Sequence, residues 1–125
     1  MCRRSELESF VRTTMNREDS DYRVQLIYQE YGTSLKHMVE TMNINEKTIT
    51  SVLEFIAEEV LLGERKFAHV LVLLAFCIEL DQHCKSKQFP WYSKENLTEI
   101  IVNVLWKVDF VPPPSLYSFK ICNIL

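Results

Sequence analysis

The segment that most constrains the fold runs from Lys66 to Cys84, because its middle, Val70 to Ile78, is apolar without interruption. A helix that has no polar face is stable in water only when other elements surround it. The run is far shorter than the roughly 18 apolar residues that indicate a membrane-spanning helix. The sequence therefore predicts an all-α fold in which a buried central hydrophobic helix is surrounded by amphipathic helices.

Four further stretches carry apolar residues at helical spacing, and they supply the helices that would surround the central one. Gly32 interrupts the second stretch, where it predicts a bend or a split in the helix. The four apolar stripes are Leu7, Phe10 and Val11; Val24, Ile27, Tyr28, Tyr31, Leu35, Met38 and Met42; Ile49, Val52, Leu53, Ile56 and Val60; and Leu97, Ile100, Ile101, Val104, Leu105 and Val108.

Polar residues at the starts of these stripes predict where the helices begin. Ser5 and Glu8 are three residues apart and resemble a capping box. Asn45 or Ser51 is expected to begin the third helix, and Ser93 to cap the last one.

The domain organisation follows from length and from proline. A chain of 125 residues with 47% hydrophobic and 25% charged residues fits one globular domain. Pro112-Pro113-Pro114 cannot continue a helix. We therefore expect one helical domain over residues 1–111 and a proline-rich tail over 112–125 without a transmembrane anchor.

Charge and cysteine content limit the partners and the compartment. The net charge is −3 and no basic stripe occurs, so nucleic acid is not an expected partner. Cys77 and Cys84 lie about 10 Å apart along one helix, which is too far for a disulfide. Without a secretory signal, we expect reduced thiols in a cytoplasmic protein.

A search for catalytic or metal-binding patterns finds little. His37, His69 and His83 fall in no zinc-binding pattern, and no glycine-rich phosphate loop is present. Glu58 and Glu59 are adjacent on a helix, so they point in different directions. We expect no enzymatic activity and no cofactor. A thiol-dependent helical enzyme that uses the cysteines near His83 stays as a distant alternative.

The last four residues, beginning at Cys122, fit a prenylation pattern whose terminal leucine favours geranylgeranyl. Asn123 stands where an aliphatic residue is usual, and the preceding segment is not polybasic. Coincidence is therefore the better interpretation. A single lipid would in any case anchor the chain only weakly.

One segment resembles a known family. Residues Glu59 to Leu80 resemble the first homology motif of the Bcl-2 family, in which an Asn-Trp-Gly-Arg motif leads into a buried central helix. Here Lys66-Phe67-Ala68-His69 occupies that motif. Upstream, Leu35-Lys36-His37-Met38-Val39-Glu40 resembles the third homology motif, with Val39 where the family has glycine.

The order of the helices also matches that family over Ser5 to Phe110, but the C-terminal part departs from it. The second homology motif and the membrane anchor are not found after Phe110, where Leu116-Tyr117-Ser118-Phe119 stands instead. A groove without its C-terminal wall exposes apolar surface, which is typical of an interface. We therefore also expect a homodimer.

The resemblance implies a hydrophobic groove that receives an amphipathic helix. His69 stands where the family has the arginine that pairs with the ligand's aspartate, so we expect a narrow range of ligands, with Lys66 or Arg65 as substitute cations. The groove residues implied by position are Met42, Ile56, Glu59, Val60, Lys66, Ala68, His69, Leu71, Val72 and Phe76.

The function that the resemblance implies is inhibition of apoptosis. The chain would sequester the Bcl homology 3 helix of pro-apoptotic host proteins such as Bim, in the host cytoplasm or at the mitochondrial surface. Short, anchorless members of the family are typical of large DNA viruses of the iridovirus type, so the resemblance implies a viral protein.

Two alternatives stay open. A viral protein with the same fold could inhibit innate immune signalling through another surface. A death-fold adaptor would also be small and helical, but the uninterrupted apolar run from Val70 to Ile78 counts against it.

Overall fold

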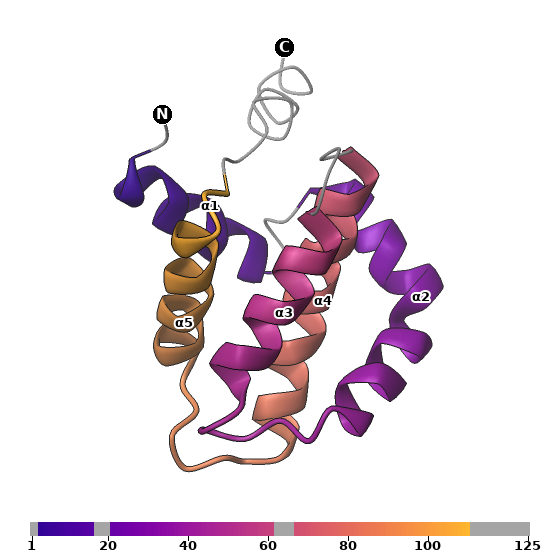
Figure 1. The fold of residues 1–125 in the computed structure, drawn as a ribbon. Helices are drawn as coiled ribbons and strands as arrows, with labels where there is room; N and C mark the ends of the chain where they lie inside the picture. Colours follow the sequence, from indigo (N-terminus) through magenta and orange to yellow (C-terminus); the bar gives the residue numbers. More distant parts are fainter. Residues whose placement is uncertain (1–2, 17–20, 62–66, 111–125) are drawn as a thin grey trace.

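The chain is all-helical in the parts that the computed structural model describes, which are residues 3–16, 21–61 and 67–110. Five helices and no strand occur in these ranges (Figure 1). This confirms the all-α prediction. The helices are α1 (Arg4–Met15), α2 (Tyr22–Thr41), α3 (Ile49–Leu61), α4 (Phe67–Ser86) and α5 (Lys94–Lys107).

The central helix is α4, as the apolar run predicts. It contacts each of the other four helices. Every residue from Leu73 to Asp81 is buried, which means that all sides of the helix are covered in this stretch. The core of the molecule is therefore arranged around α4.

The other helices are attached to α4 unequally. α3 contacts both α4 and α5, and α1 contacts both α5 and α4, whereas α2 contacts α4 alone among the described helices. α2 and α5 lie on opposite sides of the α3–α4 pair (Figure 1). α2 and α3 thus both pack on α4 without contacting each other.

The helix starts partly match the expectations. Ser93 caps α5 as predicted, since its side chain accepts a hydrogen bond from the Asn96 backbone N–H at 3.0 Å. Asn45 organises the turn before α3 by accepting from the backbone of Lys47 and Thr48. The capping box at Ser5 is wrong.

α1 begins one residue before Ser5. Arg3 occupies the N-cap position there, and its side chain makes no capping hydrogen bond. The split that Gly32 could have caused does not occur, because α2 runs without a break from Tyr22 to Thr41. A glycine inside a helix costs roughly 1 kcal/mol relative to alanine but does not by itself end the helix when packing holds both halves.

The joint between α4 and α5, residues 87–93, is not helical. Phe89 and Trp91 stack with ring centroids 5.5 Å apart. The proline-rich segment 112–114 and the rest of the tail lie outside the described residues, as does Cys122.

Candidate functional site

Two helices that flank α4 carry apolar side chains at the border between core and solvent. We call these the apolar edges. Except for Tyr31, which is exposed, their members are half-buried and pack against the core. The edge on α2 consists of Ile27, Tyr31, Met38 and the C-cap residue Met42, and the edge on α3 consists of Val52, Ile56 and Val60.

An ion pair between α3 and α5 shows which side of α3 carries the apolar edge. Lys107 of α5 binds Glu54 of α3, with Nζ and Oε1 3.2 Å apart. Ile56 lies two residues after Glu54, roughly 160° around the helix from it. The apolar edge of α3 therefore faces away from α5, toward the side on which α2 lies.

α4 passes between the two edges, and it carries several of the residues that the family motif assigns to a groove. His69 is exposed in the first turn of α4, whereas Phe76 is 1% exposed and belongs to the core. Leu71 is buried and lies roughly 160° around the helix from His69. These three side chains consequently do not form one surface.

Val72 is 40% exposed, and it precedes Glu79 by seven residues. It therefore lies on the face of α4 that also bears Glu79.

Glu59 is exposed on α3. Of the ten residues implied by position, Met42, Ile56 and Val60 lie on the apolar edges. Lys66 lies outside the described residues, and Ala68 is placed only as part of the first turn of α4.

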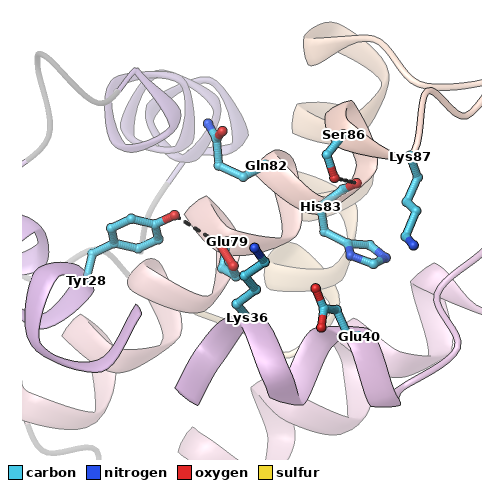
Figure 2. A pocket seen from close by; sticks show the side chains of 8 residues that line it. All are labelled: Tyr28, Lys36, Glu40, Glu79, Gln82, His83, Ser86 and Lys87. Atoms are coloured by element: carbon cyan, nitrogen blue, oxygen red, sulfur yellow. Dashed lines mark hydrogen bonds between the residues drawn. The ribbon is translucent and has the colours of Figure 1, made fainter. Parts of the chain in front are cut away.

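A polar cleft of about 410 Å³ lies on the other side of α2, between α2 and α4 (Figure 2). Sequence reasoning missed this cleft because its polar residues are scattered along two helices. It is lined by Tyr28, Lys36 and Glu40 from α2, and by Glu79, Gln82, His83, Ser86 and Lys87 from α4 and the residue that follows it.

The base of the polar cleft is a hydrogen bond between the two helices. The hydroxyl of Tyr28 donates to Glu79 Oε2 at 2.9 Å, and Glu79 is only 5% exposed. A buried carboxylate is costly unless it is hydrogen-bonded, so this contact fixes α2 on α4.

His83 stands in the same cleft with charged groups around it. Burial lowers the pKa of His83, and the positive charge of Lys87 lowers it further, while Glu40 and Glu79 oppose both effects. The ring lies above the carboxylate of Glu40 in Figure 2. His83 is half-buried near the end of α4.

A second buried carboxylate, Asp81, anchors the joint that follows α4. It accepts a hydrogen bond from the Tyr92 hydroxyl at 2.7 Å and one from Lys94 Nζ at 3.2 Å. Burial raises the pKa of Tyr92, and the hydrogen bond to Asp81 raises it further. Two acids inside an otherwise apolar segment were the sequence signal that such partners must exist.

The two cysteines of α4 are free thiols and buried. Burial raises the pKa of Cys77 and that of Cys84 to about 12, so neither is a thiolate near neutral pH. These two residues therefore supply no reactive nucleophile. In the described ranges no group of three potential ligands could hold a metal ion. None of the helices described there is long and apolar enough to cross a membrane.

Comparison with known proteins gives no relative. No family model matches the chain, and neither a curated protein nor a solved structure is significantly similar to it. The resemblance to the Bcl-2 family therefore rests on the two sequence motifs and the order of the helices, and it stays a prediction.

Proposed function

We propose that the chain is a helix-binding module that holds an amphipathic helix between α2 and α3, over α4. Following the motifs of the sequence, the occupant is the Bcl homology 3 helix of a pro-apoptotic protein, and the chain is an inhibitor of apoptosis with a Bcl-2-like fold. The chain then acts by sequestering its partner, without chemistry of its own.

What carries the proposal is the arrangement of the apolar edges. α2 and α3 each pack on α4 and do not contact each other. Both present half-buried apolar side chains on the sides that flank α4. An amphipathic helix offers anchors at i, i+3, i+4 and i+7, which match two parallel apolar rows better than a flat patch.

The position of His69 bears on the range of ligands. An exposed histidine can give the aspartate of a ligand helix one hydrogen bond, whereas an arginine gives a bidentate pair. A module of this kind depends on its apolar contacts, so it selects helices whose anchors fit well.

The direct test is a titration of the full chain with a labelled Bcl homology 3 peptide of the Bim type, followed by fluorescence polarisation. We expect saturable binding to the native chain. Val60→Glu places a charge on the apolar edge of α3 and should weaken binding at least about 100-fold. His69→Ala should weaken it only a few-fold.

Leu26→Glu is the matched control, because Leu26 is also an apolar residue but is 53% exposed and lies roughly 160° around α2 from Tyr28, which contacts α4. It should bind the peptide as the native chain does. A charge at Leu71 is not informative, since this residue is buried and the substitution tests folding. Native affinity in Val60→Glu, with an unchanged melting curve, would refute the proposal.

A further inference from the structure

The outer face of α3 combines an aromatic ring with a carboxylate beside the apolar edge. Phe55 is 61% exposed, the largest exposure among the large hydrophobic residues in the described ranges. Glu59 follows it by one helical turn and is also exposed. Residues four apart on a helix have Cβ atoms about 6 Å apart, so ring and carboxylate lie side by side.

This pair stands next to the apolar edge. Counting about 100° per residue, Glu59 lies within about 20° of Val52, and Phe55 within about 60° of it. A helix seated against Val52 and Ile56 would therefore pass Phe55 and Glu59 with its own flank. Such a helix would cover the exposed ring of Phe55.

All charged side chains of α3 are acidic. The helix contains Glu54, Glu58 and Glu59 and no basic residue. Glu54 is bound by Lys107. The side chain of Glu59 is exposed and makes no hydrogen bond or ion pair within the described residues.

From these observations we propose that the ligand helix presents an arginine that lies over the ring of Phe55 and pairs with Glu59. This inference rests on the proposed function, which it deepens by naming a feature of the partner. An arginine fits both groups at once because its guanidinium is planar, stacks on aromatic faces and donates to a carboxylate in the same plane. A lysine is a compact and strongly hydrated cation that cannot stack on the ring, so it fits the pair of groups less well.

The probe is a set of amphipathic helical peptides with identical apolar anchors. They carry arginine, lysine or the neutral isostere citrulline at each position of the flank in turn. At the position that meets Phe55 and Glu59, we expect the arginine peptide to bind the full chain about five- to tenfold more tightly than the citrulline peptide, with lysine in between. The preference should shrink as salt is added.

Protein variants then locate the contact. Glu59→Gln should remove the preference for arginine over citrulline and leave the affinity for the citrulline peptide unchanged. Phe55→Ala should remove the preference for arginine over lysine. Glu58→Gln is the matched control, because Glu58 is exposed on the same helix but lies near the side of Glu54 and α5.

The outcomes separate the two proposals. Binding of the peptides with no position at which arginine is preferred would overturn the arginine contact alone. Equal losses in Glu59→Gln and Glu58→Gln would do the same, because they would show a general charge effect. If no peptide of the set binds, both this inference and the proposed function fall.

Discussion

The two sides of α2 differ in what they offer to a partner. One side carries the apolar edge, with Ile27 and Met38 half-buried against the core. The other side lines the polar cleft, where Lys36, Glu40 and His83 stand in or beside water. A ligand that covers the apolar edge releases water from apolar surface, whereas a ligand in the cleft must first desolvate charges.

The polar side of α2 also holds this helix on α4, so the two sides of α2 have different roles. Tyr28 is bound to the buried Glu79 of α4, so α2 is fixed from the cleft side. The side chains of Ile27 and Met38 on the apolar edge are held by apolar packing, which has no preferred direction, so they can adjust to a ligand. One side of α2 is thus fixed and the other can adjust, which suits a surface that binds another helix.

The largest expected effect comes from placing the same charge on either side of α2. Met38→Glu should weaken binding of the labelled Bcl homology 3 peptide about 100-fold, because the ligand would bury the new carboxylate. Lys36→Glu changes the net charge more than Met38→Glu does, but it does so in the polar cleft. It should therefore leave the affinity for the peptide within about twofold of the native value. Thermal melting of both variants checks that each is folded. The opposite ranking would place the ligand in the polar cleft and reverse the comparison.

The second prediction uses two tyrosines of α2, one on each side. Tyr28→Phe removes the donor from Glu79 and leaves a buried carboxylate without this bond, so the free energy of unfolding should fall by about 1.5–3 kcal/mol. Tyr31→Phe removes an exposed hydroxyl from the apolar edge and should change stability by less than about 0.5 kcal/mol. Urea denaturation measures both. Equal losses in the two variants would mean that the Tyr28–Glu79 bond does not fix α2.

The smallest effect concerns the pH dependence of the cleft. Burial and Lys87 lower the pKa of His83 below its ordinary value of 6.5, and Glu40 and Glu79 reduce that shift. Because the folded-state pKa is the lower one, the unfolded chain takes up the proton first as the pH falls through about 6.5, and stability is lost there. Below the folded-state pKa the loss is complete.

Denaturation of the native chain and of His83→Gln between pH 8 and pH 5 isolates this contribution, since all other groups titrate in both. The native chain should lose slightly more stability on acidification than the variant does. A larger loss in the variant would mean that the attraction of Glu40 and Glu79 outweighs burial, and that the polar cleft binds α2 more tightly in acid.

Much of the fold could be predicted from the sequence, because helical periodicity locates amphipathic helices directly. The stripes predicted α2, α3 and α5, and the uninterrupted apolar run predicted the central position of α4. The start of α1 was placed wrongly, since a serine and a glutamate three apart also occur inside a helix, as Ser5 and Glu8 do.

The candidate site could be predicted only in part, for a reason that lies in α4 itself. Where a helix is apolar on every side, its sequence does not reveal which residues face which neighbour. Leu71, Val72 and Phe76 were assigned to one groove by position in a motif, but Leu71 and Phe76 are buried in the core, whereas Val72 is 40% exposed. On α3, where the sequence alternates between polar and apolar faces, Ile56 and Val60 lie on one edge as a groove requires.

The attachment of α2 to a single neighbour also bears on how the molecule opens. A helix that packs on one other helix can leave it without disturbing the contacts among the remaining four. We therefore expect residues Tyr22–Thr41 to open as one unit, ahead of global unfolding. Each such excursion breaks the Tyr28–Glu79 bond and exposes a carboxylate that is buried in the folded molecule. The amide protons of α2 should accordingly exchange with solvent sooner than those in the middle of α4.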